Sequence, residues 1–216
     1  TERSLLLVGS PMCSSFSRLQ HLNWGRMSPD EVQSVKDYGR KHLQFACKLY
    51  TLQKELNLYF LHEHPASATS WSEPCVTKLL KSDGVSKVVS DMCVYGMEQE
   101  DESGRALVKK PTAFMTNSPE IARRLNQRCV GGHRHITLIG GRAKRAEVYP
   151  EQLCREILLG LVDQMRVDGR LLGGGCLGSV GLVDEDSATQ QETIASYWDE
   201  VSGKELDPVR VQSARA

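Results

Sequence analysis

The chain has 216 residues, enough for one domain with a substantial core and too few for two full domains. Lysine plus arginine and aspartate plus glutamate are equal at 27 each, so the overall charge does not point to a nucleic-acid partner. No apolar run approaches the roughly 18 residues of a membrane span and no signal segment is recognisable, so we expect an intracellular protein without a membrane partner. Seven widely spaced cysteines, an odd number, favour reduced thiols.

The first predicted element is a short strand over residues 5–8, which stops at Gly9 and leads through Pro11 to Cys13. Large aliphatic residues in a row, bounded by glycine and proline, are typical of a strand buried on both faces in the middle of a parallel sheet. Ligands of open α/β sheets bind at the carboxyl ends of the strands, so Cys13 is a candidate site residue. The alternative is a structural role, because free cysteine is among the most often buried residue types.

A long amphipathic helix is predicted over residues 28–56. Ser28 is a capping residue, Pro29 occupies the first helical position, and Glu31 stands three residues after the cap. Apolar residues then recur at helical spacing with lysine and arginine between them, so one face of this helix is expected to cover a core.

A second buried strand over residues 58–63 completes a βαβ unit, which implies two parallel strands. Glu63 then lies at the same edge of the sheet as Cys13. The elements predicted after it are a helix over 72–82, a strand over 85–94 that completes a second βαβ unit, an acidic loop over 97–106, an antiparallel strand over 112–116 beside the third strand, a helix over 117–127, a short strand over 136–139 and a helix over 149–167.

These elements predict an α/β fold, a partial doubly wound, Rossmann-like sheet with flanking helices. The predicted domain covers residues 1–170 and includes a basic annex over about 123–145. Beyond it the sequence becomes glycine-rich and then acidic, so we expect a flexible, poorly ordered tail or linker over 171–216. Because the chain opens directly on a strand, we also expect it to be a piece of a longer protein.

Three short motifs, each at the end of a predicted strand, resemble the cytosine-5 DNA methyltransferases. The segment Gly9-Ser10-Pro11-Met12-Cys13-Ser14-Ser15-Phe16-Ser17 resembles the family's Pro-Pro-Cys motif with its following Phe-Ser. Glu63-His64-Pro65 resembles the Glu-Asn-Val motif, and Tyr95-Gly96-Met97-Glu98-Gln99 resembles the Tyr-Gly-x-Pro-Gln segment. Met12 and the pair His64-Pro65 depart from the family pattern.

In this family a cysteine thiolate adds to carbon 6 of cytosine, and carbon 5 then takes a methyl group from S-adenosylmethionine. The resemblance implies Cys13 as the nucleophile and Glu63 as the acid at the ring nitrogen, with DNA as the partner and the target base rotated out of the helix. The family's cofactor motif precedes its cysteine motif, so the S-adenosylmethionine site is expected largely outside this chain. The implied substrate-binding residues are Ser10, Pro11, Ser14, Phe16, Ser17, His64, Tyr95, Gly96, Gln99 and Lys110.

A second resemblance is to methyltransferase-like regions of copia-type retroelement polyproteins. It rests on three segments, residues 110–118, 129–135 and 197–208. This resemblance implies an alternative function, a degenerate, non-catalytic nucleic-acid-binding module of such a polyprotein. The expected location of the chain is intracellular, with the nucleus as one candidate compartment. A further alternative is a thiol enzyme in which Cys13 works with His62 or His64.

Three metal-capable side chains, Cys129, His133 and His135, fall within seven residues. Cysteine and histidine are ligands of zinc, and a fourth ligand could come from Cys93 or Cys154 in the folded chain. The alternative is a basic loop with a partly buried cysteine.

The segment over residues 123–145 carries basic residues and no acidic ones, against a neutral chain. Such a stretch suits contacts with phosphate groups, and a solvated surface is the alternative. The residues that we expect to contact nucleic acid are Arg128, Arg134, Arg142, Lys144 and Arg145.

Overall fold

The computed structural model of the chain describes residues 4–17, 24–139 and 142–171. All of these belong to one unit, Thr1–Gly173, and a second unit, Gly174–Ala216, lies outside the described residues. The predicted tail therefore lies almost entirely outside them.

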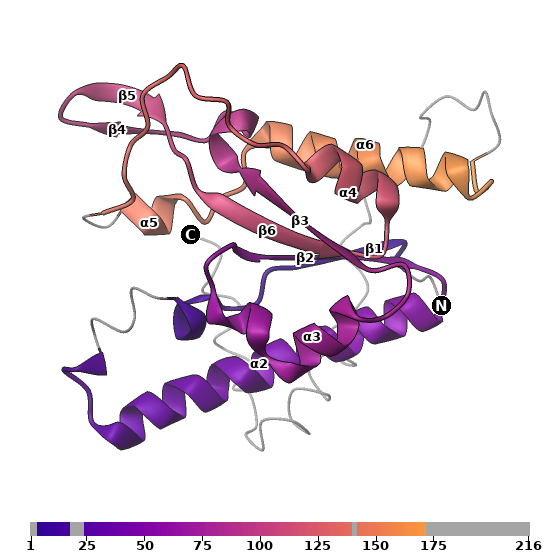
Figure 1. Ribbon diagram of the computed structural model, residues 1–216, viewed down its shortest axis with the longest axis horizontal. Helices are drawn as coiled ribbons and strands as arrows, with labels where there is room; N and C mark the ends of the chain where they lie inside the picture. Colours follow the sequence, from indigo (N-terminus) through magenta and orange to yellow (C-terminus); the bar gives the residue numbers. More distant parts are fainter. Residues whose placement is uncertain (1–3, 18–23, 140–141, 172–216) are drawn as a thin grey trace, which may run out of the picture. The chain divides into compact units, whose positions relative to one another are not determined.

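A four-stranded mixed sheet forms the centre of the unit, with the strand order β1-β2-β6-β3 (Figure 1). Its strands are β1 (Leu6–Gly9), β2 (Tyr59–Pro65), β6 (Pro111–Thr116) and β3 (Ser86–Asp91). β1 and β2 are parallel, whereas β6 is antiparallel to both β2 and β3. The first βαβ unit and the antiparallel pairing of residues 112–116 with the third strand are thus confirmed.

One expectation about the sheet is wrong, and another holds only in part. β1 is an edge strand that pairs only with β2 within the described residues, and its Val8 is 44% exposed, so it does not lie in the middle of the sheet. The strands of the second predicted βαβ unit, β2 and β3, run in the same direction, but β6 is inserted between them, so they are not neighbours in the sheet. The result is a mixed α/β sheet, and the predicted partial doubly wound, Rossmann-like arrangement is not confirmed.

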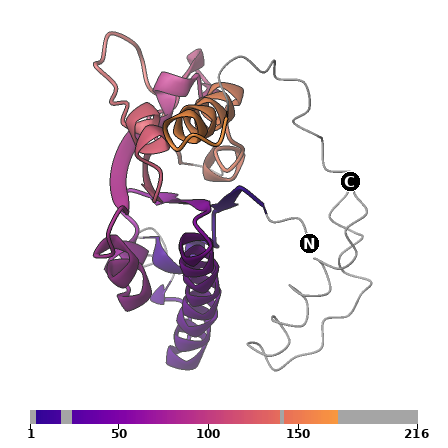
Figure 2. The same cartoon turned by 90° about the vertical axis from the view of Figure 1, so that its right-hand side faces the viewer.

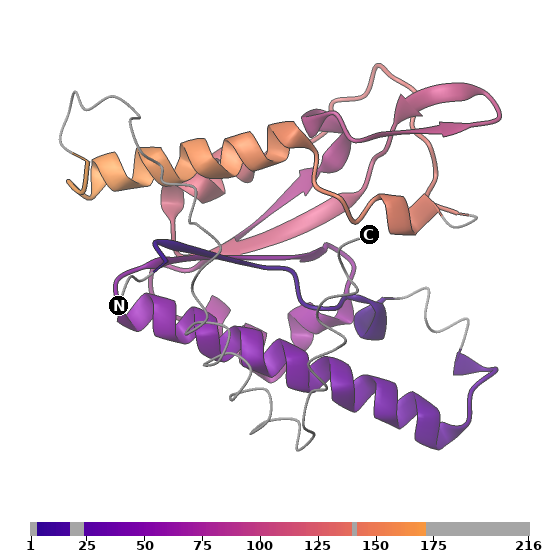
Figure 3. The ribbon, with the colours of Figure 1, turned by 180° about the vertical axis from the view of Figure 1, so that it is seen from behind.

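Helices cover both faces of the sheet (Figures 2 and 3). α2 (Pro29–Glu55) and α3 (Pro74–Leu80) pack on one face, and α4 (Pro119–Leu125) and α6 (Glu151–Val167) pack on the other. Neighbouring strand residues alternate between the two cores, as the pleat requires. Phe60 and Met115 face the α2 side, and Leu61 and Phe114 face the α6 side.

The capped start of α2 is confirmed. The Ser28 Oγ accepts a hydrogen bond from the Glu31 amide, and the Glu31 carboxylate accepts one from the Ser28 amide at 2.7 Å, which is a complete capping box. Gly39 does not interrupt the helix. Because a Cβ at Gly39 would lie 2.5 Å from the Cβ of Ser15, the glycine lets the segment after β1 approach α2 closely.

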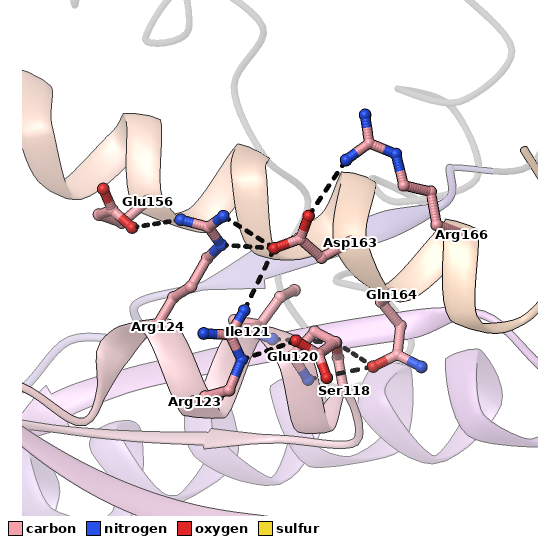
Figure 4. Close-up of polar contacts among 9 residues, drawn as sticks. All are labelled: Ser118, Glu120, Ile121, Arg123, Arg124, Glu156, Asp163, Gln164 and Arg166. Atoms are coloured by element: carbon pink, nitrogen blue, oxygen red, sulfur yellow. Dashed lines mark hydrogen bonds and ion pairs between the residues drawn. The ribbon is translucent and has the colours of Figure 1, made fainter. Parts of the chain in front are cut away.

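α4 and α6 are joined by a polar seam beside their apolar contact (Figure 4). Asp163 accepts hydrogen bonds from Arg123 at 3.3 Å and from Arg124 at 2.8 Å. Ser118, the cap of α4, donates to Gln164 at 2.9 Å. These contacts make α4 and α6 one packed layer.

The remaining elements are short. A two-stranded hairpin, β4 (Glu98–Asp101) and β5 (Gly104–Leu107), forms where an acidic loop was expected. No strand forms over 136–139, and the preceding residue, His135, forms a single bridge with Leu107. The other short elements are the 3-10 turns η1 (Ser14–Phe16), η3 (Thr69–Ser72) and η4 (Met92–Tyr95), and the helix α5 (Arg142–Arg145).

Candidate functional site

Cys13 lies in the loop that follows β1, at the start of η1. Its carbonyl accepts a hydrogen bond from the Phe16 amide at 3.0 Å, which closes the turn. The turn is anchored on α2 because Ser15 donates to the Val35 carbonyl at 3.1 Å and Phe16 is buried in the core. Because Ser15 and Phe16 are fixed in this way, the half-buried Cys13 is held at the carboxyl edge of the sheet.

Glu63 lies near the carboxyl end of β2, one residue beyond the pairing of His62 with Gly9. Its side chain is almost fully buried, with 7% exposure of the residue, and it accepts a hydrogen bond from Ser10 Oγ at 3.0 Å. The other carboxylate oxygen lies 3.9 Å from the ammonium of Lys110. The loop that carries Cys13 is thus tied to the Glu63 carboxylate through Ser10.

Two distant segments complete the cluster. The ammonium of Lys110, just before β6, donates to the Ala146 carbonyl at 3.0 Å. The Tyr149 hydroxyl hydrogen-bonds Ser10 Oγ, so residues 146–149 close over the carboxylate. We call Ser10, Cys13, Glu63, Lys110 and Tyr149 the thiol cluster.

Charges and burial in the thiol cluster act on the cysteine in opposite directions. Burial raises the pKa of Cys13, the Glu63 carboxylate raises it further, and the nearby Lys110 ammonium lowers it. The resting side chain is consequently a thiol at neutral pH. Burial, followed by the charge of Glu63, also raises the pKa of the Tyr149 phenol, which stays protonated and able to donate.

His64 supports the loop from behind the cluster. Its Nε2 donates to the Pro11 carbonyl at 2.7 Å, so the neutral ring accepts at Nδ1 from Ser70 Oγ at 2.6 Å. Burial lowers the pKa of His64 to about 4. His64 is fully buried and both of its ring nitrogens are engaged, so its place is that of a positioning residue.

A Cys–His arrangement is not formed. His62 shares its Nδ1 with the Tyr50 hydroxyl at 3.1 Å, and burial lowers the pKa of His62 to about 3. In the described part of the chain, no hydrogen bond joins the Cys13 thiol to His62 or His64. These contacts do not favour the alternative in which one of these histidines serves the thiol as a base.

The third motif lies elsewhere. Tyr95 and Gly96 follow β3, which is separated from β2 by β6. Tyr95 is buried and its hydroxyl lies 3.0 Å from Ser90 Oγ, while Gly96 ends η4 with a φ of +78°. Gln99 donates to the Arg142 carbonyl at 3.0 Å. Among the described residues, these three form no hydrogen bond with Cys13, and they belong to the neighbouring layer.

The predicted basic residues divide into two groups. Arg128 pairs with Asp91 at 3.0 Å and Arg134 pairs with Asp101 at 2.7 Å, so both have acidic partners from other segments. Arg142, Lys144 and Arg145, by contrast, take part in no ion pair within the described residues, although Arg142 donates to the Ile139 carbonyl at 3.4 Å. α5, which carries them, immediately precedes Ala146 of the lysine contact and therefore lies beside the thiol cluster.

A second cluster lies at the carboxyl end of β3. One ligand atom each from Cys93, Cys129, His133 and His135 comes within 4.8 Å of the others, so these four residues could hold a metal ion. Of the two candidates for a fourth ligand, Cys93 joins the cluster, whereas Cys154 is exposed on α6. Burial, with the neighbouring Cys129, raises the pKa of Cys93 to about 11.

Two residues that contribute hydrogen bonds in or behind the thiol cluster were not identified from the sequence. Tyr149 and Ser70 act through partners 139 and 6 residues away, and neither belongs to a motif. The proline after Tyr149 marked a helix start, but nothing in the pattern paired this tyrosine with Ser10.

No family model, curated protein or solved structure matches the chain. Among the described residues, no helix is long and apolar enough to cross a membrane.

Proposed function

We propose that the thiol cluster binds a cytosine-type base and adds the sulfur of Cys13 to carbon 6, as in the catalytic part of a cytosine-5 DNA methyltransferase. The observation that carries the proposal is the gathering of Cys13, Glu63 and Lys110 at the carboxyl ends of β1 and β2. A thiol nucleophile beside a buried carboxyl group is the pair of groups that this addition needs.

The addition can be written with the chain's own groups. The sulfur forms a bond to carbon 6, and the double bond between carbons 5 and 6 moves to carbons 4 and 5. The electron pair of the double bond between carbon 4 and nitrogen 3 moves onto nitrogen 3, which takes up a proton. The Glu63 carboxylate takes the proton from the Cys13 thiol and passes it to nitrogen 3, so the carboxylate is unchanged at the end. Ser10 and Lys110 hold Glu63 in place, and the Lys110 charge favours the thiolate as it forms.

DNA is the proposed source of the base. α5 brings Arg142, Lys144 and Arg145 next to the segment that closes over Glu63. Arginine and lysine contacts with phosphates hold a strand without reading its sequence. When a base rotates out of its stack and enters the thiol cluster, the phosphates on either side of it would stay near these three residues.

S-adenosylmethionine, which the family resemblance implies, does not fit the residues described. No strand among them is followed by a glycine-rich turn that opens a helix. Gly9 at the end of β1 serves another purpose, because a Cβ there would lie 1.9 Å from the Tyr50 hydroxyl. The proposal therefore covers base binding and thiol addition only.

A non-catalytic nucleic-acid-binding module, the alternative, is favoured by one observation. Burial and the Glu63 charge both raise the pKa of Cys13, which works against a reactive thiolate in the free protein. The two functions share a DNA surface and differ in whether a covalent bond forms.

Covalent trapping separates the two functions. DNA whose cytosines carry nitrogen in place of carbon 5 is attacked more readily at carbon 6, and the adduct survives a denaturing gel. We expect a shifted band with the wild-type chain, none with Cys13→Ser, and an unchanged band with Cys154→Ser, whose cysteine is exposed on α6. Salt-sensitive DNA binding without any shifted band would establish the non-catalytic module instead.

A further inference from the structure

We propose that Cys93, Cys129, His133 and His135 bind a structural zinc ion. The four side chains come from η4 and from the irregular segment after α4, and all four ligand atoms lie within 4.8 Å of one another. Two thiols and two imidazoles make up one of the usual ligand sets of structural zinc. This inference is independent of the chemistry proposed for Cys13.

The distances between ligand atoms match those around a zinc ion. The Cys129 Sγ lies 3.6 Å from His133 Nε2 and 3.5 Å from His135 Nε2. Zinc–sulfur bonds of about 2.3 Å and zinc–nitrogen bonds of about 2.0 Å place sulfur and nitrogen about 3.5 Å apart at a tetrahedral angle. Both imidazoles present the same nitrogen, Nε2, to the sulfur, as two ligands of one ion would.

The backbone between the ligands is built to bring them together. Gly131 and Gly132 have φ of +87° and +83°, a left-handed conformation that residues with a side chain adopt only at a cost. This turn returns the chain so that His133 and His135 face Cys129. The Gly131 amide also donates to the Cys129 sulfur at 3.3 Å, a contact that stabilises a thiolate.

Buried Asp91 fixes the position of the loop relative to β3. Its backbone amide donates to the Gln127 carbonyl at 3.1 Å, and its carboxylate accepts from the Cys129 amide at 3.0 Å. The same carboxylate pairs with Arg128. Since Cys93 lies two residues after Asp91, these bonds hold Cys129 beside Cys93 and act as outer support for the ligands.

A metal ion accounts for the order of a long irregular segment. Residues 126–139 contain neither a helix nor a strand, apart from the bridge of His135 with Leu107. Irregular segments of this length are uncommon within a domain and need their own source of order. The segment leads towards α5, so the ion would also steady the basic helix beside the thiol cluster.

The charges balance when zinc binds. Both thiols release their protons to solvent, and two thiolates neutralise the doubly charged ion. Four protein ligands fill the coordination sphere, which is typical of a structural site. A disulfide between Cys93 and Cys129 would use the same two sulfur atoms and is the competing arrangement.

The direct test is the metal content of the full chain after equilibration with zinc under reducing conditions and removal of free metal. We expect about one zinc ion per chain, and less than about a fifth of that in Cys129→Ser and His133→Ala. Cys154→Ser is the matched control, because its exposed cysteine lies outside the cluster, and it should keep the ion.

A second measurement uses the wild-type chain alone and does not depend on a variant that folds. Chelation should release zinc and make about two more thiols available to a thiol reagent, and cobalt should give the visible spectrum of a tetrahedral thiolate site. Wild-type protein that holds well under one zinc per chain, or that carries a Cys93–Cys129 disulfide under the reducing conditions, would overturn the proposal.

Discussion

Two opposite charges that belong to one ion pair act on the Cys13 thiol. Glu63 raises the pKa of the thiol and Lys110 lowers it, while burial of the side chain has the largest effect. The carboxylate and the ammonium are themselves 3.9 Å apart. The reactivity of Cys13 is therefore set by a balance that single substitutions at Glu63 and Lys110 shift in opposite directions.

Alkylation of Cys13 tests this balance, because iodoacetamide reacts with the thiolate. Glu63→Gln removes the charge that raises the pKa and should speed alkylation, whereas Lys110→Gln should slow it, each by roughly two- to tenfold. Rates are read at pH 8 by peptide mass mapping, with exposed Cys154 of the same molecules as internal reference. A change in the same direction for both variants would show that packing, and not charge, controls the thiol.

The residues of the thiol cluster differ in how well their place in the fold could be predicted from the adjacent sequence. Cys13 and Glu63 each follow an apolar run, so their place at one sheet edge could be predicted, and the parallel pairing of β1 with β2 supports it. Tyr149 could not, since its partner Ser10 lies 139 residues away. The burial of His64 likewise depends on the helical layers that cover both faces of the sheet, so it could not be predicted from its own segment.

At the scale of helices and strands, the sequence predicted a helix correctly where a capping residue and the helical spacing of apolar residues occurred together. α2 begins at Pro29 after its capping serine, and α4 begins at Pro119 after Ser118. The hairpin β4–β5 was missed because its strands are polar and lack the alternation of a half-buried strand. The insertion of β6 between β2 and β3 depends on pairing between distant segments, which no local pattern encodes.

The contact of α6 with α4 depends on a glycine. A Cβ at Gly160 would lie 2.8 Å from the Ile121 Cα, which belongs to the backbone and has little freedom to move. Gly160→Ala should lower the free energy of unfolding by about 1–2 kcal/mol, because the strain of overpacking exceeds the gain in helix propensity. Urea denaturation measures the change, and Cys154→Ala on the exposed side of α6 is the control. An equal or greater stability of Gly160→Ala would mean that the helices separate without cost.

For the whole molecule, two buried histidines link folding to pH. Burial lowers the pKa of His62 to about 3 and that of His64 to about 4, below the ordinary value of 6.5. The unfolded chain therefore takes up these protons first as the pH falls. Their contribution to stability is complete above pH 6.5 and is lost below it, until the folded values are reached.

The expected slope is about 1.4 kcal/mol per pH unit for each histidine between pH 6 and about 4. Urea titrations at several pH values measure this slope. His62→Gln should reduce it by the contribution of one histidine, about 1.4 kcal/mol per pH unit. This comparison leaves the histidines of the metal cluster unchanged in both proteins. A slope that His62→Gln does not alter would show that His62 is protonated in the folded state.

The sheet with its two helical layers carries the two clusters at the carboxyl ends of β2 and β3, on either side of β6. This placement makes α5 and residues 146–149 a link between the basic surface and the thiol. Under the proposed function, this link delivers a base to Cys13.

The most direct test is to map the covalent adduct formed with DNA that contains the cytosine analogue with nitrogen at position 5. After digestion of protein and DNA, peptide mass spectrometry should find the modified base on the sulfur of Cys13, with Cys75 and Cys154 unmodified. An adduct confined to any other cysteine, or no adduct while the DNA is bound, would contradict the account.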